Sequence, residues 1–177
     1  MSWLGHVLGR RDLPPAIALR LAAWRSLPQP DTGVPPRRWV VLDTETSGLD
    51  TARDALISIG AVAMEDDAIV VAPAFEAILR QANPSSHENI ALHGVGAGAQ
   101  SQGEDPVEAL MRFLEFARKD PLVAWHASFD AAFLRRALKR HLGPGLANEW
   151  LDVAVLAPRK LSGQKVGSAG PGVGVAG

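Results

Sequence analysis

Two acidic residues stand one position apart at the end of an apolar run. Residues 39–42 are bulky and apolar, without glycine or proline, and Asp43 and Glu45 follow them. Such a run predicts a buried β-strand. Alternate residues of a strand share a face, so both carboxylates are expected on one side of the strand end. Close carboxylates repel unless a proton or cation neutralises them, and hard oxygen ligands suit Mg²⁺ or Mn²⁺. The alternative is a turn with two solvated acids.

A third candidate acid lies in a second polar segment. Residues 121–125 predict a short buried strand, and a helix from Ser128, as its N-cap, to about Leu142 is expected to follow. Asp130 then falls in the first helical turn, where backbone N–H groups and the helix dipole stabilise a carboxylate. The alternative is a helix-start acid without a catalytic role.

The elements that would position these acids alternate between strands and helices. After the first strand, the pattern predicts strands over 56–64 and 68–79, joined by short turns as an antiparallel meander. A short helix over 88–92, a mobile small-residue segment over 96–103 and a helix over 105–119 are expected next. With the later strand and helix and a short element around Asp152, this order predicts an α/β fold with some parallel pairing.

The two ends of the chain differ from this middle part. Residues 1–36 predict an appendage, with an amphipathic helix over 13–27 that packs on the domain and a proline-rich linker to the first strand. Residues 37–161 are expected to form the main domain. Residues 162–177 are rich in glycine and alanine and hold no acid or aromatic residue, which predicts disorder.

Composition excludes several classes of function. The 177 residues carry a net charge of -1 and no cysteine, which predicts one ordinary soluble domain and excludes disulfides, thiol nucleophiles and cysteine-ligated metals. The near-neutral charge argues against nucleic-acid binding through bulk charge, but not against an enzyme that grips a few phosphates. No long apolar run occurs, so we expect no membrane segment and a cytoplasmic location.

Together, the acidic segments resemble the DEDD 3′–5′ exonucleases, the family of the bacterial DNA polymerase III epsilon subunit. Residues 43–48 match the pattern D-x-E-T-S/T-G, and residues 126–130 match H/N-A-x-F-D about eighty residues later. Residues 83–95 resemble N-P…E…(I/V)-H-G-(I/V), and residues 150–157 resemble (I/L)-D-T-L-x-L-A-R. The resemblance covers roughly residues 37–160 and implies a ribonuclease-H-like mixed sheet, three antiparallel strands first, flanked by helices.

The resemblance also implies roles for individual residues. Asp43, Glu45 and Asp130 would be the catalytic acids and ligands of two Mg²⁺ or Mn²⁺ ions, which in such sites lie about 4 Å apart and activate the attacking water. Glu88 and His93 lie where family members contact the terminal nucleotide; a loop acid and a helix-end cap are the alternatives. The implied substrate is the 3′ end of a single nucleic-acid strand, taken to be DNA, and a DNA polymerase is an implied partner. The whole implied substrate-binding set is Thr44, Thr46, Ser47, Glu88, His93, His126 and Phe129.

Two features depart from the family pattern. His126 replaces the usual asparagine, a change we expect to be tolerated because both side chains can hydrogen-bond. The family's last motif, H-x-x-x-x-D or Y-x-x-x-D, has no counterpart, since the chain has no tyrosine, no histidine after His141 and no acid after Asp152. The chain thus resembles a histidine-subclass member that is truncated or frame-shifted, lacks the C-terminal helix and is impaired in activity.

Three further interpretations stay open. A non-catalytic nucleic-acid-binding or interaction module could keep the same fold. A haloacid-dehalogenase-type phosphatase would use a D-x-D-x-T motif, but here the second acid is Glu45 and no later acidic pair follows Asp130. Basic residues on the helix after Asp130 could guide a strand's phosphates, although a solvated helix face is the more common arrangement. They are Arg135, Arg136, Lys139, Arg140 and His141.

Overall fold

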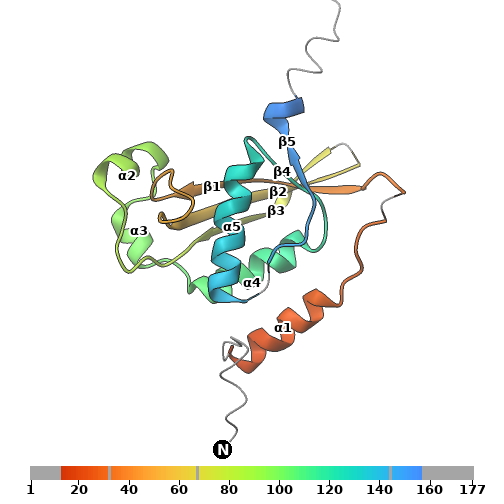
Figure 1. Ribbon diagram of the computed structural model, residues 1–177, viewed down its shortest axis with the longest axis horizontal. Coiled ribbons are helices and arrows are strands. Elements are labelled where there is room, and N and C mark those ends of the chain that lie inside the picture. The colour runs from red at the N-terminus through yellow and green to blue at the C-terminus, as the bar shows by residue number, and fades with distance from the viewer. Residues whose placement is uncertain (1–12, 32, 67, 144, 157–177) are drawn as a thin grey trace, which may run out of the picture.

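Five strands form one mixed sheet in the computed structural model, which describes residues 13–31, 33–66, 68–143 and 145–156. The strands are β1 (Arg38–Thr46), β2 (Leu56–Glu65), β3 (Ala68–Ile78), β4 (Leu122–Ala124) and β5 (Trp150–Asp152). Their order across the sheet is β3-β2-β1-β4-β5. The first three pair antiparallel, and β1, β4 and β5 run parallel (Figure 1). The predicted α/β mixed sheet is therefore confirmed.

The described residues contain five helices flanking this sheet. They are α1 (Pro15–Arg25), α2 (His87–His93), α3 (Ala97–Ser101), α4 (Pro106–Ala117) and α5 (Ala127–His141). Helix α4 begins where expected, because the Asp105 carboxylate accepts hydrogen bonds from the first free backbone N–H groups and Pro106 needs no partner there. None of the described helices is long and apolar enough to cross a membrane.

The alternation of side chains along β1 separates the core from the exposed face of the sheet. Val40, Leu42 and Thr44 are buried on the side covered by α4 and α5, where the apolar residues form one cluster with residues of both helices. Asp43 is exposed and Glu45 partly exposed on the other side. The period of two therefore sends both acids out of the core, as predicted.

Helix α1 packs on α4, as expected for the predicted N-terminal helix. Ile17, Leu21 and Trp24 are buried in the common core cluster. The Trp24 indole Nε1–H donates to the Arg118 carbonyl oxygen at 2.9 Å. Arg20 binds two carboxylates of α4 with hydrogen bonds of 2.7–2.8 Å, so apolar and ionic contacts both attach α1 to the domain.

Two local predictions were wrong. The segment over 96–103, expected to be mobile, contains helix α3, because the Gln100 side chain is fully buried and bonds to Ser85 and the Val95 carbonyl group. Ser128 does not cap α5, because the helix begins at Ala127 and His126 occupies the cap position without a side-chain bond. The predicted disordered tail, residues 162–177, lies outside the described residues.

Candidate active site

A pocket of about 570 Å³ opens on the exposed face of the sheet, toward the carboxyl end of β1. Asp43 and Glu45 line it, together with His93 from the end of α2. Their partners across the strand pair are small: Gly60 stands opposite Asp43, and Ser58 opposite Glu45. A Cβ atom at Gly60 would meet no atom within 4 Å, so the space beside Asp43 is open to a ligand.

The charges of the acids act on one another within this pocket. Burial raises the pKa of the Glu45 carboxyl, and the negative charges of Asp43 and Asp130 raise it further, whereas His93 lowers it. The Glu45 carboxylate therefore lies close enough to Asp43, Asp130 and His93 to feel the charge of each. None of the three carboxylates forms an ion pair with a lysine or arginine among the described residues.

Asp130 lies behind the other two acids, in the first turn of α5. Its side chain is buried, and its Oδ1 accepts a hydrogen bond of 2.7 Å from the Thr44 hydroxyl. Burial raises the pKa of the Asp130 carboxyl, and nearby Asp43 adds to that shift, while the Thr44 bond opposes it. The bond joins β1 to α5 across 86 residues of sequence and orients the Asp130 carboxylate.

The hydrogen bonds of His93 define its role at the edge of the pocket. Its Nδ1 accepts a bond of 3.0 Å from the Val95 backbone N–H, so the proton of the neutral ring lies on Nε2. Nε2 lies 3.2 Å from the Ser85 hydroxyl oxygen, to which it donates. His93 thus caps the end of α2 and also lines the pocket. The geometry therefore agrees with a helix-end cap and with a contact to the terminal nucleotide.

The remaining predicted substrate-binding residues do not line this pocket. The Thr46 hydroxyl donates to the Gly48 carbonyl oxygen, and the Ser47 hydroxyl accepts from the Ala55 N–H. Glu88 is exposed in the first turn of α2. His126 is exposed at the start of α5, and the Phe129 ring packs on the core, 4.9 Å from that of Phe133. Their contacts with a nucleotide stay predictions.

Sequence reasoning missed several residues that shape the site. Ser58 and Gly60 were assigned only to a strand, and their place opposite the acids follows from the register of β1 and β2. A Cβ atom at Gly48 would lie too close to the Asp54 carboxylate, so a larger residue there would require the Asp54 side chain to move. Asp152 anchors the end of β5, where its Oδ1 accepts from the backbone N–H groups of His126 and Ala154.

The donor set fits a hard divalent cation by its chemistry. Asp43, Glu45 and Asp130 supply carboxylate oxygens, and they lack a cationic partner among the described side chains. The charge of Asp43 raises the pKa of both Glu45 and Asp130, in addition to the effect of burial. Among the described residues, however, no three acidic or histidine side chains are grouped closely enough to hold a metal ion.

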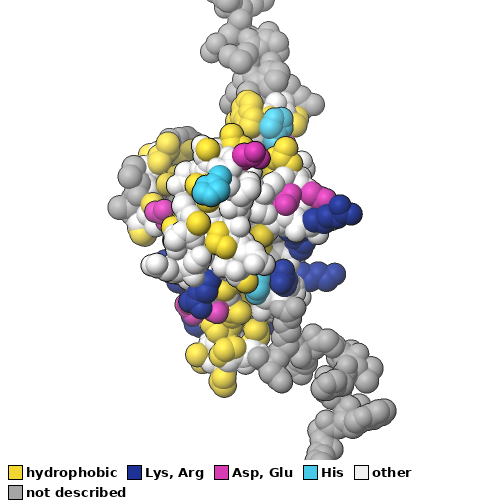
Figure 2. All heavy atoms as spheres, turned by 90° about the vertical axis from the view of Figure 1, so that its left-hand side faces the viewer, with side chains coloured by type: hydrophobic (Ala, Val, Ile, Leu, Met, Phe, Trp, Pro, Cys, Tyr) yellow, Lys and Arg dark blue, Asp and Glu magenta, His cyan; other side chains and the backbone are white. Residues whose placement is uncertain are grey.

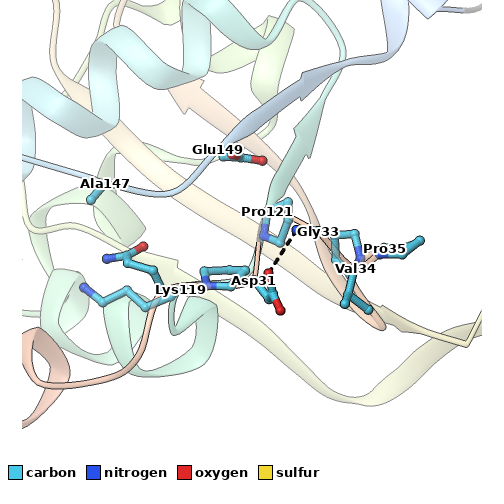
Figure 3. Close-up of a pocket in the computed structure, with 11 residues that line it drawn as sticks. Asp31, Gly33, Val34, Pro35, Lys119, Pro121, Ala147 and Glu149 are labelled. Atoms are coloured by element: carbon cyan, nitrogen blue, oxygen red, sulfur yellow. Dashed lines mark hydrogen bonds between the residues drawn. The ribbon is translucent and has the colours of Figure 1, made fainter.

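A second pocket, of about 600 Å³, lies at the opposite, amino end of the parallel strands (Figure 3). The proline-rich segment and the residues before β4 and β5 line it, and Lys119, Asp31 and Glu149 are its charged side chains. It contains none of the predicted site residues. Ligands of open α/β sheets bind outside the carboxyl ends of the strands, so the pocket with Asp43 is the better candidate active site.

Comparison with known proteins agrees with this assignment. The profile of the exonuclease family RNase_T matches residues 40–162. A DNA polymerase III PolC-type protein of Thermotoga petrophila is 32% identical over 119 residues, which are 67% of this chain and 9% of that protein. A DNA polymerase III subunit epsilon-like protein of Rhodobacter capsulatus is 32% identical over 120 residues, 67% of this chain and 17% of that protein. The chain therefore spans less than a fifth of these relatives.

Solved structures with a similar fold include two of exonuclease I. The apo form aligns with a TM-score of 0.64 at 13% identity, covering 72% of this chain and 31% of that one. The E. coli enzyme in complex with a dA16 oligonucleotide aligns with a TM-score of 0.63 at 13% identity, covering 72% and 30%. These similarities identify the fold as ribonuclease-H-like. Since the family profile matches most of the chain, including the segments that carry all three acids, the chain belongs to the exonuclease family RNase_T.

Proposed function

We propose that this chain is a metal-dependent 3′–5′ exonuclease that hydrolyses the terminal phosphodiester bond of a single nucleic-acid strand. The main support is the open pocket where Asp43 and Glu45 lie beside Asp130 without a cationic partner among the described residues. Bare carboxylates would repel an anionic phosphodiester, so such a pocket accepts that substrate only with bound cations. Membership of an exonuclease family agrees with this chemistry.

Asp43, Glu45 and Asp130 would hold Mg²⁺ or Mn²⁺. When bound there, such ions neutralise the phosphate and lower the pKa of a water molecule that can attack it. Asp43 and Glu45 offer their oxygens directly to the pocket, whereas Thr44 must release or share the Asp130 carboxylate. The buried hydroxyl of Thr44 is thus proposed to position Asp130.

His93 is proposed to contact the terminal nucleotide as a positioning residue. Both of its ring nitrogens are engaged, by the Val95 N–H and the Ser85 hydroxyl, so His93 does not act as the general base in this arrangement. Contacts of the nucleotide with Glu88, His126 and Phe129 are proposed on the family pattern, with Thr44, Thr46 and Ser47 at the same strand end.

We further propose that these 177 residues hydrolyse nucleic acid slowly. The family's general base belongs to the last motif, and no histidine follows His141 and no acid follows Asp152. Loss of a general base lowers a rate by about 10²–10⁴-fold, and a lost carboxylate ligand weakens the metal site as well. A version extended by a helix that bears H-x-x-x-x-D is expected to be faster by at least that factor.

The test measures nucleotide release from a 3′-labelled single strand with Mn²⁺. Four proteins are compared: this chain, the extended version, and the Glu45→Gln variant of each. Release that depends on Glu45 and increases in the extended version supports the proposal. The matched control is Glu149→Gln, which removes an exposed charge at the opposite end of the sheet. Strand binding without release in any version would instead favour a non-catalytic module.

DNA is proposed as the substrate, and a DNA polymerase as a partner, because the matched relatives are DNA polymerase III proteins. Competition between DNA and RNA strands of the same sequence tests the first point. Equal or stronger inhibition by RNA would overturn it. Co-sedimentation with the replicative DNA polymerase of the source organism tests the second, and the two proteins sedimenting independently would contradict it.

A further inference from the structure

A groove of about 390 Å³ lies between the loop after β1, the end of β3 and α5. Four arginine side chains from three separate segments line it: Arg53, Arg80, Arg136 and Arg140. No aspartate or glutamate is among its lining residues. We name it the arginine groove. In a protein with a net charge of -1, this is a local concentration of positive charge.

The guanidinium groups of the groove are largely uncompensated by acids. Within the described part of the chain, Arg80, Arg136 and Arg140 form no ion pair, and Arg53 has a single loose one, 3.8 Å from Asp50. Arg80 donates from Nε to the Gly103 carbonyl oxygen, and Arg136 lies 5.2 Å from the centroid of the Phe133 ring. Both contacts hold the side chains in place but leave most guanidinium N–H donors available to an anion.

One end of the groove reaches the loop that follows β1, the strand that carries Asp43 and Glu45. Ser47 lines it and stands two residues after Glu45, at the carboxyl end of β1. The Asn89 side chain of α2 donates to the Ser47 carbonyl oxygen, which connects this end of the groove to the helix that ends at His93. Figure 2 views the molecule from the left-hand side of Figure 1. In this view the lysine and arginine side chains lie in the lower part and at one edge, and none is visible in the upper part.

We propose that the arginine groove binds consecutive backbone phosphates of the strand whose 3′ end lies at Asp43 and Glu45. This inference rests on the proposed exonuclease function and adds a binding site for the part of the strand that is not cleaved. Guanidinium groups bind phosphate oxygens in a bidentate manner, and such contacts position a strand without reading its sequence. The groove therefore favours long strands over very short ones, whatever their bases.

The helix α5 offers a matched pair of double variants. Arg136→Gln with Arg140→Gln removes two charges from the groove, whereas Arg135→Gln with Lys139→Gln removes two charges from the same helix outside it. Binding of a 5′-fluorescein oligothymidylate of about twelve nucleotides is measured by anisotropy with Mn²⁺, with Glu45→Gln added to every protein so that hydrolysis is suppressed. We expect roughly tenfold weaker binding for the groove variant and a salt-dependence slope smaller by about 1.4, because each phosphate contact on a single strand contributes about 0.7.

Equal losses in both double variants would overturn the proposal, since the effect would then reflect overall charge. An unchanged affinity in the groove variant would overturn it as well. Arg53→Gln is the independent check, because this side chain is exposed and its removal leaves α5 intact. It should weaken binding about threefold, with a slope smaller by about 0.7, and circular dichroism melting confirms that each variant is folded.

A second measurement separates this inference from the proposed function. In the extended version with Mn²⁺, the groove variant should lose kcat/KM on the long strand but keep it on a dinucleotide, which is too short to reach the groove. If the groove variant hydrolyses both substrates as fast as the original, the exonuclease function is supported and the proposed role of the groove is wrong. If the strand binds through the groove but no version hydrolyses it, the role of the groove is supported and the exonuclease function is wrong.

Discussion

His126 adopts a left-handed backbone conformation, with φ of 57°, in the turn between β4 and α5. Its backbone N–H donates to Asp152 Oδ1, so the end of β5 helps to hold this turn in place. Histidine and asparagine are among the residues that tolerate this conformation, whereas β-branched residues do not. The geometry therefore explains why histidine can stand where the family pattern has asparagine.

We predict that His126→Asn leaves stability within about 0.5 kcal/mol of the original, while His126→Val lowers it by about 1–2 kcal/mol. Urea denaturation followed by circular dichroism measures both. A valine variant as stable as the asparagine variant would show that the turn changes its conformation to relieve the strain.

Gly60 matters because of its place in the sheet, beside the candidate active site. It stands opposite Asp43 and leaves open space where a side chain would otherwise stand. We predict that Gly60→Val keeps the fold, because valine suits a strand, but lowers kcat/KM at least tenfold by filling the pocket beside Asp43. Gly60→Ala is the graded control and should lose less. Both variants are measured in the extended version. If Gly60→Val there has the same kcat/KM as the protein with Gly60, the nucleotide does not bind in this part of the pocket.

Helix α1 is the element whose attachment can be tested most directly. Arg20 donates to the carboxylates of Glu108 and Glu115 on α4. The bond from Arg20 lowers the pKa of Glu115 below its ordinary value of 4.5, although burial opposes the shift. A carboxyl whose pKa is lower in the folded state stabilises the fold above the unfolded pKa, and that contribution is lost as the pH falls through the folded pKa.

We predict that Arg20→Met lowers the free energy of unfolding by about 1 kcal/mol at neutral pH. The loss should become smaller as the pH falls through the lowered pKa of Glu115, because the protonated carboxyl no longer pairs with Arg20. Arg25→Met, on the last turn of the same helix, is the control and should have little effect at neutral or acidic pH. A loss for Arg20→Met that is independent of pH would mean that packing of its aliphatic chain, not the ion pairs, attaches α1.

For the molecule as a whole, the two faces of the sheet differ. Helices α4 and α5 bury one face, while Trp39, Val41, Val62 and Met64 on the other are only partly buried. These apolar side chains continue from the pocket that holds Asp43 along β1 and β2. An exposed apolar face of this kind favours association with another surface.

We predict that the chain dimerises or aggregates as its concentration rises, and that Val62→Thr with Met64→Thr reduces this association. Sedimentation velocity over a concentration series measures it. Leu19→Ser, which removes an exposed leucine of α1, is the control for a general gain in solubility. A single monomeric species across the series would contradict the prediction.

Local patterns in the sequence were sufficient for much of the fold. The two-residue period of a strand placed Asp43 and Glu45 on one face, and the period of helices identified the buried faces of α1 and α4, because both repeats depend on neighbouring residues only. The start of α4 at Asp105 and Pro106 followed for the same reason. The resemblance of the acidic motifs to an exonuclease family added the fold class, which the strand order and the family profile confirm.

Only the tertiary structure determined which distant residues meet. The register of β1 and β2 places Gly60 beside Asp43, and the packing of α5 on the sheet joins Thr44 to Asp130. Helix α3 exists because Gln100 finds buried partners in another segment, which no local propensity of its small residues would indicate. The arginine groove likewise gathers charges from three segments. Such contacts depend on strand register and helix packing, which single-segment patterns do not encode.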